Sequence, residues 1–343
     1  MDIRHQLKQV LRELYARLLF HSGAHRLLDR CMPRRLLVLA GHCVSTHENV
    51  QLGPHMRIDG ERLERILAWF ARRYEVLELG RALERLEQPG KRSLVALTMD
   101  DGYKDNRTQL LPLLQRLQLS ATLYLESAPL EERRLNWTHK FAWVLARLGA
   151  RRFAELYSER SGMALGAELS DYQMKRALKY EAPVVERTRV VDELFREQAG
   201  DERALCEQLY LDWQEVRELD RAGIEIGAHT HSHEILARLE PAQALQEIQG
   251  SKHLLERGLG HAVRSFAYPF GRRWDYHASA QECVREVGFA SATTTHAGTN
   301  RKGAGRYELR RVMIDEDTRL HRLVAEACGG FDLLRRFGIE LGE

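Results

Sequence analysis

Two patterns of apolar residues alternate along the chain. Short, nearly continuous apolar runs are typical of buried strands, and longer stretches with an apolar residue at every third or fourth position are typical of amphipathic helices. The clearest expected helices are residues 62–73 and 110–117, and the expected strands are residues 36–40, 94–99, 121–125, 224–227, 265–268 and 290–294. Strands that alternate with helices predict an α/β fold with a mainly parallel sheet, open or closed into a barrel.

One long stretch interrupts this alternation. Residues 136–211 are rich in charged and helix-forming residues and contain no expected strand. Because ordinary connections between a strand and a helix are far shorter, this stretch predicts an inserted helical subdomain. Asp212 and Glu215 have the spacing of a capping box, which predicts a helix that ends near Gly223. The predicted organisation is an N-terminal helical segment, a main domain in two pieces and the insertion, at residues 1–35, 36–135 with 212–343, and 136–211.

The N-terminal segment is basic and amphipathic. Residues 1–35 contain eight Lys or Arg against three Asp or Glu, an excess of five positive charges. Apolar residues recur there at helical spacing, at Leu7, Val10, Leu11, Leu14 and Leu18. The favoured interpretation is a helix that packs on the protein's own core. The alternative is a basic helix that lies on an anionic membrane surface.

Composition excludes several classes of function and site. The net charge of +3, without a basic stripe interleaved with aromatic residues, argues against a nucleic-acid partner. No apolar run approaches the roughly 20 residues that span a bilayer, and charged residues interrupt the N-terminal apolar positions, which is unlike a signal peptide. The cysteines are widely spaced and form no CxxC pair, so they suit a reducing compartment: Cys31, Cys43, Cys206, Cys283 and Cys328. We therefore expect a cytoplasmic protein, with contact to the inner membrane face through the basic segment as an extension.

Polar clusters directly follow four of the expected strands. In parallel α/β folds, ligand-binding and catalytic groups gather at the carboxyl ends of the strands. This placement predicts a single active face. The clusters are Asp-Asp-Gly at 100–102, His-Thr-His-Ser-His at 229–233, Tyr-Pro-Phe-Gly at 268–271 and Thr-Thr-His at 294–296.

The histidine cluster and one carboxylate predict a metal site. Asp101 with His229 and His233 gives three ligands and leaves positions open, as a catalytic ion requires. The two histidines are four residues apart, so one helical turn would place both rings on one face, with His231 pointing elsewhere. A lone histidine is more often a surface or hydrogen-bonded residue, but three within five residues directly after a strand favour a metal.

The neighbouring carboxylates Asp100 and Asp101 predict two different roles, one as a proton acceptor and one as a metal ligand. Asp-Asp-Gly is a common turn, but two carboxylates directly after a buried strand are costly unless a cation or a proton partner compensates them. Because adjacent side chains diverge, Asp101 can bind the ion while Asp100 accepts a proton from water. In the Tyr-Pro-Phe-Gly cluster, a backbone N–H of Phe270 or Gly271 is a candidate donor to a developing oxyanion.

At these residues the sequence resembles the polysaccharide deacetylase family that shares the NodB homology domain, carbohydrate esterase family 4. The family's Thr-Phe-Asp-Asp-Gly motif appears as Thr-Met-Asp-Asp-Gly at 98–102, and its His-Ser/Thr-x-x-His motif appears at 229–233. The resemblance implies a distorted, incomplete (β/α) barrel with a metal at the strand ends. It also implies Asp100 as base, Thr230 as a support of the loop, and Asp101, His229 and His233 as ligands.

The third motif departs from the usual family pattern. Ala267 stands where the family commonly has an arginine, and Tyr268, Pro269 and Phe270 resemble the substrate-side motif of an exopolysaccharide-type subgroup. Another group must then orient Asp100, and the candidates are Arg311 and Arg264.

The proton donor of the family is not evident either. The family's late Leu-x-His motif is absent after residue 312, and His321 lies in an expected helix. His42 matches a segment of the same subgroup and follows the first strand, so we expect it near the site as a catalytic candidate. His296 is a second candidate, and a structural role fits either histidine equally well.

These residues predict metal-dependent hydrolysis of an N-acyl group from an amino sugar. The resemblance implies one divalent ion, Zn²⁺ first, with Co²⁺ or Ni²⁺ also accepted by two histidines and one carboxylate. The expected substrate is an N-acylated amino sugar, as an oligosaccharide or as a nucleotide- or lipid-linked glycan. Three alternatives stay open: a deformylase that acts on a lipid-linked amino sugar, an inactive glycan-binding or regulatory module, and an amidohydrolase-type barrel suggested by the His-x-His at 229–231.

Overall fold

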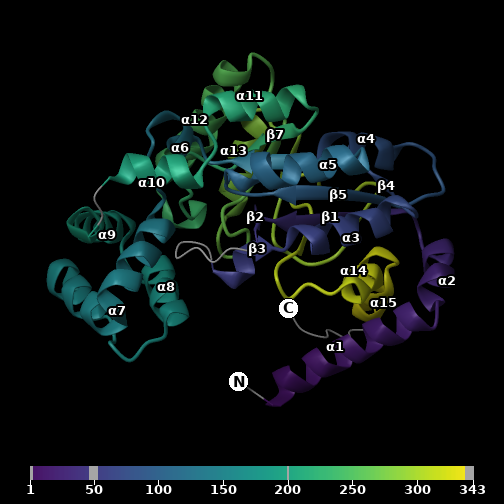
Figure 1. Ribbon diagram of the computed structural model, residues 1–343, viewed down its shortest axis with the longest axis horizontal. Helices are drawn as coiled ribbons and strands as arrows, with labels where there is room; N and C mark the ends of the chain where they lie inside the picture. Colours follow the sequence, from purple (N-terminus) through teal and green to yellow (C-terminus); the bar gives the residue numbers. More distant parts are fainter. Residues whose placement is uncertain (1–2, 46–52, 199–200, 337–343) are drawn as a thin grey trace.

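A curled sheet of nine strands forms the centre of the computed structural model, which describes residues 3–45, 53–198 and 201–336 (Figure 1). The strand order is β10-β1-β5-β6-β7-β8-β9, and each pair along it is parallel except β10 with β1. The strands of this path are β1 (Arg35–Gly41), β5 (Leu94–Met99), β6 (Thr122–Leu125), β7 (Glu225–Ala228), β8 (Ser265–Ala267), β9 (Ser291–Thr293) and β10 (Asn300–Arg301). All six expected strands are therefore confirmed, and the fold is a distorted, incomplete (β/α) barrel.

Four short strands complete the sheets. β4 (Glu75–Val76) pairs with β5, and β2 (Cys43–Val44) pairs with β3 (Arg57–Ile58) in a separate two-stranded sheet. β11 (Val312–Met313) pairs with β1. None of these was expected, because two residues are too few to carry a periodic pattern.

Residues 306–313 bridge the gap between β1 and β9, which lie at opposite ends of the parallel part of the sheet. The first part of this segment bonds to β9, with Leu309 N–H donating to the Ala292 carbonyl, and its second part is β11 beside β1. Arg311 lies between the two pairings. The segment therefore carries this side chain to the mouth of the barrel.

Helices cover the outside of the sheet, and α4 (Leu79–Glu87) packs against the opposite face of its strands. The apolar residues of α4 contact Leu36, Val38 and Leu94, which alternate with the strand residues that face the outer helices. The capping box of Asp212 and Glu215 is confirmed at the start of α11. The other covering elements are α3 (Gly60–Ala71), α5 (Leu111–Leu117), α6 (Ser127–Glu131), α11 (Trp213–Arg221), α12 (Pro241–Leu259) and α13 (Ala278–Glu286), with single turns at Pro54–Met56, Asn106–Leu110 and Leu236–Arg238.

Four helices between β6 and β7 gather on one side of the barrel (Figure 1). They surround an apolar cluster of their own, which includes Trp137, Phe153 and Phe195, and Tyr103 from the barrel side joins it. The helices are α7 (Trp137–Ser161), α8 (Asp171–Tyr180), α9 (Val184–Gln198) and α10 (Glu202–Leu209). The division of the chain into the predicted domains stays a prediction.

The N-terminal helix packs through a face other than the apolar stripe. α1 (Ile3–His21) rests on α14 (Leu320–Ala327) and α15 (Gly330–Arg336) through Ala16 and Leu19, and α2 (Ala24–Cys31) follows it. The helix therefore packs on the protein, as the favoured interpretation expected, but it does not use the apolar stripe, whose five members are exposed: Leu7, Val10, Leu11, Leu14 and Leu18. Among the helices within the described residues, none is long and apolar enough to cross a bilayer.

Candidate metal centre and active site

The two carboxylates of the site leave β5 in different directions. Asp100 still donates its backbone N–H to the Gly41 carbonyl at 2.9 Å, so it remains part of the sheet edge. Asp101 has a φ of 72° and Gly102 a φ of 83°, a left-handed turn that a non-glycine residue rarely adopts. A Cβ at Gly102 would lie 2.8 Å from a Leu125 methyl carbon, so a larger residue would have to displace Leu125 and also adopt a strained backbone. This turn points the two carboxylates at different partners, as expected.

The two predicted histidine ligands lie on a loop rather than on a helical turn, so the expected helical turn is wrong. Residues 229–235 have no helix, and both Thr230 and His233 have left-handed backbones, with φ of 65° and 59°. This curl brings the rings of His229 and His233 to a centroid distance of 4.9 Å. The two rings therefore lie together, as the spacing predicted, but a curled loop brings them there and not a helical turn.

Buried hydrogen bonds hold this loop. The Thr230 hydroxyl accepts from the His233 N–H at 3.1 Å, which fits the role of loop support that the resemblance implies. Glu247 of α12 accepts from the backbone N–H groups of His231 and Ser232. The His231 ring contacts Ser127 and Glu132, so it points away from the other two rings as expected.

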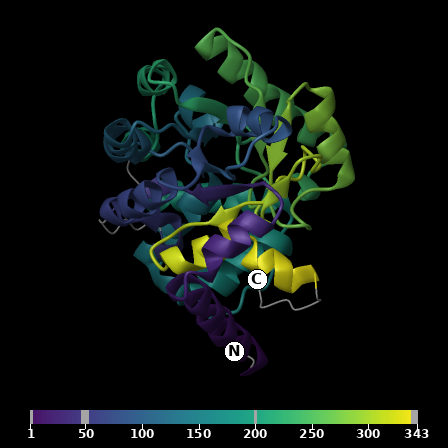
Figure 2. The same cartoon turned by 90° about the vertical axis from the view of Figure 1, so that its right-hand side faces the viewer.

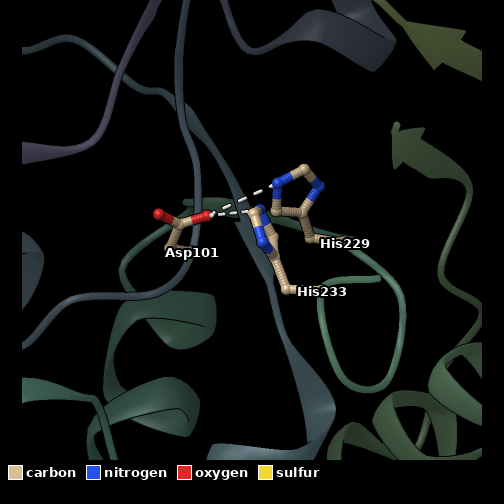
Figure 3. A group of neighbouring side chains, drawn as sticks. All are labelled: Asp101, His229 and His233. Atoms are coloured by element: carbon tan, nitrogen blue, oxygen red, sulfur yellow. Dashed lines mark ion pairs between the residues drawn. The ribbon is translucent and has the colours of Figure 1, made fainter. Parts of the chain in front are cut away.

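Asp101, His229 and His233 converge on one buried point (Figure 3). The Nε2 atoms of His229 and His233 lie 3.4 and 3.5 Å from the same oxygen of Asp101, Oδ1. That oxygen is buried and has no hydrogen-bond partner among the described residues. Three donor atoms within 4.8 Å of one another, around an unsatisfied carboxylate oxygen, fit a divalent transition-metal ion.

The surroundings of each ring set its protonation. The Nδ1 of His229 lies 2.7 Å from the Ala267 carbonyl, which can only accept, so Nδ1 carries a hydrogen and Nε2 is the atom that faces Asp101. Burial opposes protonation of His229, but Asp101 and Asp100 outweigh it and raise its pKa, so a metal ion would compete with a proton for Nε2. Burial lowers the pKa of His233 to about 3, which keeps that ring neutral. Burial opposes ionisation of Asp101, but the electrostatic attraction of the neighbouring His229, His233 and His42 outweighs it and holds the pKa of the carboxyl well below the usual range.

Asp100 is held by Arg311, as one of the two sequence candidates predicted. The guanidinium donates two hydrogen bonds to the carboxylate, at 2.7 and 2.8 Å, and a third to the Thr294 carbonyl. Burial opposes ionisation of Asp100, but Arg311 outweighs it and holds the pKa of the carboxyl below its usual range. Arg264 is exposed and precedes β8, at the opposite end of that strand from the site, so it does not play this part.

We expect Arg311→Leu to destabilise the protein by about 3–5 kcal/mol, because it leaves Asp100 buried without its cation. Urea unfolding followed by circular dichroism measures the change. The double variant Asp100→Asn, Arg311→Leu is the matched control and should recover part of the loss, since it removes the uncompensated charge. A loss below about 1 kcal/mol in the single variant would show that the pair is not a buried unit.

The remaining predicted residues lie at different distances from this centre. His42 follows β1 and lies close enough to both carboxylates to contribute to their low pKa values, after the larger contributions of Arg311 and His229 at Asp100 and of His229 and His233 at Asp101. Its Nδ1 is buried without a hydrogen-bond partner among the described residues. His296 lies against Tyr276 and lines a cavity of about 600 Å³. A catalytic role for either histidine stays a prediction.

In the Tyr-Pro-Phe-Gly segment, the side chains divide between core and site. Tyr268 is buried, stacks on Tyr276 and donates its hydroxyl to the Tyr307 carbonyl, so its side chain is part of the core. Pro269 leads into a turn in which Phe270 has a φ of 60°, and the Phe270 ring lies 4.7 Å from the His233 ring. The predicted substrate and oxyanion roles of Tyr268, Pro269 and Phe270 stay predictions.

Sequence reasoning missed a buried network that joins the helical segment to the site. The Tyr103 hydroxyl donates to Oδ2 of Asp101 at 2.7 Å and lies 2.9 Å from Nε2 of His139. The other ring nitrogen of His139 lies 2.9 Å from the Tyr210 hydroxyl. Tyr103 is three residues after Asp100, but no spacing rule connects it with His139 or Tyr210.

The direction of each hydrogen bond in this network follows from its members. Burial lowers the pKa of His139 to about 3, so the ring is neutral and carries one hydrogen. Because Tyr103 uses its only proton on Asp101, His139 must donate from Nε2 and accept at Nδ1 from Tyr210. The chain of donors therefore runs from Tyr210 through His139 and Tyr103 to Asp101. It fixes which oxygen of Asp101 faces the two histidine ligands.

We expect Tyr103→Phe to weaken metal binding by about 10- to 100-fold, because the partner that orients the carboxylate of Asp101 is lost. Competition for the metal against a chromophoric chelator measures the affinity without any assay of activity. Tyr210→Phe, two hydrogen bonds further along the same network, is the control and should have the smaller effect. Equal affinities for Tyr103→Phe and wild type would contradict this role.

α8 adds positive charge beside the site. The ammonium of Lys179 lies 3.5 Å from the centre of the Phe270 ring and 3.3 Å from Asp275, and burial lowers its pKa to about 8. Burial also lowers the pKa of Lys175, against the opposing charge of Asp101. Lys179 thus contacts the turn beside His233, and Lys175, one helical turn earlier on α8, is close enough to Asp101 for the two charges to interact.

Comparison of the sequence with known families agrees with this geometry. The sequence profile of a family described as polysaccharide deacetylase matches residues 87–292. A putative polysaccharide deacetylase of Bacillus subtilis, YxkH, is 29% identical over 105 residues. That match covers 31% of this chain and only 37% of the length of the Bacillus protein.

Solved structures of several deacetylases have the same fold. The Streptococcus pyogenes deacetylase PplD superposes with a TM-score of 0.55 at 17% identity, over 86% of this chain and 99% of that chain. IcaB from Ammonifex degensii superposes with a TM-score of 0.56 at 17% identity, over 87% of this chain and 98% of that chain. At this level of identity the likeness shows the fold alone.

Proposed function

The chain belongs to the polysaccharide deacetylase family, and from this premise we propose that it hydrolyses the N-acyl group, N-acetyl first, of an amino sugar. The observation that carries the proposal is the pair of adjacent carboxylates with separate partners. Asp101 faces His229 and His233, and Asp100 is clamped by Arg311. A site that only bound glycan would have no use for a buried base beside a buried ligand set.

Asp100 and Arg311 are placed to support hydrolysis of the amide bond by water. Asp100 accepts a proton from a water molecule as the water oxygen bonds to the acyl carbon, and Arg311 keeps the carboxylate oriented for that transfer. The bond between the acyl carbon and the sugar nitrogen then breaks as the nitrogen takes up a proton from a donor group, and the proton held by Asp100 restores that group after the products leave. The products are a carboxylic acid and a free amine, so a neutral sugar becomes cationic.

A divalent cation held by Asp101, His229 and His233 would supply Lewis acidity to the acyl oxygen and the attacking water. We propose Zn²⁺, and two imidazoles with one carboxylate also suit Co²⁺ or Ni²⁺. The two imidazole nitrogens among the three ligands support a transition metal over Ca²⁺ or Mg²⁺, which prefer oxygen ligands.

His42 and Lys175 are the candidates for the group that protonates the leaving amine. Each lies close enough to Asp101 for its charge to interact with that carboxylate. A lysine whose pKa burial lowers can release a proton nearer neutral pH than an exposed lysine. The two candidates come from opposite sides of the site, His42 from the barrel and Lys175 from α8.

We propose a nucleotide- or lipid-linked amino sugar as substrate, consistent with the expected cytoplasmic location near the inner membrane face. Lys175 on α8, close enough to Asp101 for the two charges to interact, favours a substrate that carries negative charge, such as a diphosphate linkage. A formyl group in place of acetyl would make the protein a deformylase, and the same residues would serve. The linked-sugar substrate and the choice of acyl group are both proposals that go beyond membership of the family.

A product assay tests the function directly. The zinc-loaded protein is incubated with UDP-N-acetylglucosamine, chitooligosaccharides and a long soluble N-acetylglucosamine polymer, and acetate and primary amine are both measured, with formate measured for N-formyl analogues. Equal amounts of acid and amine from one substrate class support hydrolysis. A marked preference for the long polymer would overturn the linked-sugar proposal. Glycan binding without any acid release would instead establish a binding module.

A further inference from the structure

One face of α1 is fixed to the body of the protein. Ala16 and Leu19 are buried against Ala325 and Phe331, and Tyr15 donates to the Gly330 carbonyl. Glu13 bonds to His321 and Arg322 of α14. Burial opposes ionisation of Glu13, but hydrogen bonds from Arg322, Arg17 and His321 lower its pKa to about 2, so the helix stays anchored at neutral pH. These contacts set which side of α1 faces outward.

The outward side is an apolar stripe. Leu7, Val10, Leu11, Leu14 and Leu18 are exposed by 58%, 54%, 46%, 57% and 67%. At about 100° per residue these five positions occupy one arc of the helix, opposite Ala16. In both views α1 lies at the edge of the molecule, and its N-terminal half projects beyond α14 and α15 (Figures 1 and 2). Five large aliphatic side chains in one exposed row are more than the scattered surface leucines of an ordinary soluble protein.

Basic residues border the stripe. Lys8 and Arg17 are exposed on α1, and α2 exposes Leu27 between Arg26 and Arg30. The acidic residue within Ile3–His21 is Glu13, and it is turned toward α14. The exposed face of α1 is therefore apolar at its centre and positive at its borders. This combination is complementary to an anionic lipid surface.

We propose that α1 is a membrane-binding helix that lies in the headgroup region of an anionic bilayer, with the stripe inserted among the acyl chains. Leucines would enter the apolar layer while Lys8 and Arg17 remain with the phosphates. Pairing of this face with a second copy of the chain would bring the like charges that border both stripes together, which disfavours it. No residue of the metal centre lies on α1, so this surface is independent of the proposed reaction.

Vesicle binding tests the proposal with the full-length protein. Wild type is centrifuged with vesicles of phosphatidylcholine alone and of phosphatidylcholine mixed with phosphatidylglycerol. We expect it to pellet with the mixed vesicles and to be released by salt, because part of the attraction is electrostatic. No pelleting with either vesicle would overturn the proposal.

Variants of exposed residues identify the surface. The triple variant Leu7→Ser, Leu11→Ser, Leu14→Ser should bind the mixed vesicles at least about 100-fold more weakly, because each exposed leucine contributes apolar area to insertion. Lys8→Gln with Arg26→Gln should reduce binding to anionic vesicles by several fold. Val185→Ser is the matched control, since Val185 is 75% exposed on α9, and it should bind like wild type.

The same variants separate membrane binding from self-association. Light scattering gives the mass of wild type and of the triple variant in the absence of vesicles. A wild-type dimer that becomes monomeric in the triple variant, together with unchanged vesicle binding, would overturn the proposal and assign the stripe to a second copy. Retention of the wild-type circular dichroism spectrum shows that the triple variant is folded.

Discussion

Replacement of both His229 and His233 with alanine is expected to remove the bound metal and to lower turnover by at least about 10³-fold. Both Nε2 atoms face the same oxygen of Asp101, and a single remaining carboxylate binds a transition metal weakly. Loss of several kcal/mol of Lewis-acid stabilisation corresponds to this fall in rate. Elemental analysis of the purified proteins should find about one divalent ion per wild-type chain and almost none in the double variant.

His231→Ala provides the matched control for this experiment. His231 belongs to the same loop, but its ring contacts Ser127 and Glu132 instead of the centre, so metal content should not change. A double variant that kept its metal would show that the ion is bound elsewhere. A wild-type protein that neither contains nor takes up zinc, cobalt or nickel would remove the basis for a catalytic centre and favour a binding module.

Asp100→Asn is expected to lower turnover by about 10²- to 10⁴-fold while the protein keeps its metal. The change removes the proton acceptor but leaves Asp101 and the two histidines in place. It also places an amide N–H group against Arg311, so the variant should be less stable than wild type. Rates are therefore compared per metal-loaded, folded chain, at a temperature well below the unfolding transition.

The pH dependence of the wild-type rate gives a second check on Asp100. Arg311 outweighs burial and holds the pKa of Asp100 below its usual value of about 3.9, so the base is ionised throughout the neutral range. A loss of activity as the pH falls from about 7 to 5 would then report protonation of a group other than Asp100, and the pKa of about 3 for His233 and His139 excludes these two rings as well. An Asp100→Asn variant with more than about a tenth of the wild-type rate would assign the base to another residue.

The sequence was a good guide to the longer strands and to the polar residues that directly follow them. The six longer strands were recognised because each is an apolar run that is buried on both faces of a parallel sheet. The polar residues that follow them had to meet at one edge, because parallel strands end at the same side of a sheet. The amino-acid sequence therefore suffices to place Asp100, Asp101, His229 and His233 together.

The backbone conformation of the histidine loop at residues 229–233 could not be predicted from the sequence. A spacing of four residues is compatible with a helical turn and with a curled loop, and the structure has the loop. Left-handed residues at Thr230 and His233 are stabilised by Glu247 of α12, a partner that no local pattern reveals. The convergence of the two rings was predictable, whereas the path was set by a distant carboxylate.

Tertiary structure alone decided three further features. Arg311 reaches Asp100 because residues 306–313 bridge β9 and β1, and the sequence could offer it only as one of two arginines. His139 joins the metal centre because four helices between β6 and β7 fold back onto Tyr103. The stripe of α1 is exposed because the helix packs on α14 and α15 through another face, which carries Ala16 and Leu19. That face has fewer large apolar residues than the stripe, but it matches the surface of the two helices. Periodicity determines that a helix has an apolar face, but the shape of the partner determines which face is buried, and that shape is assembled from residues far apart in the chain.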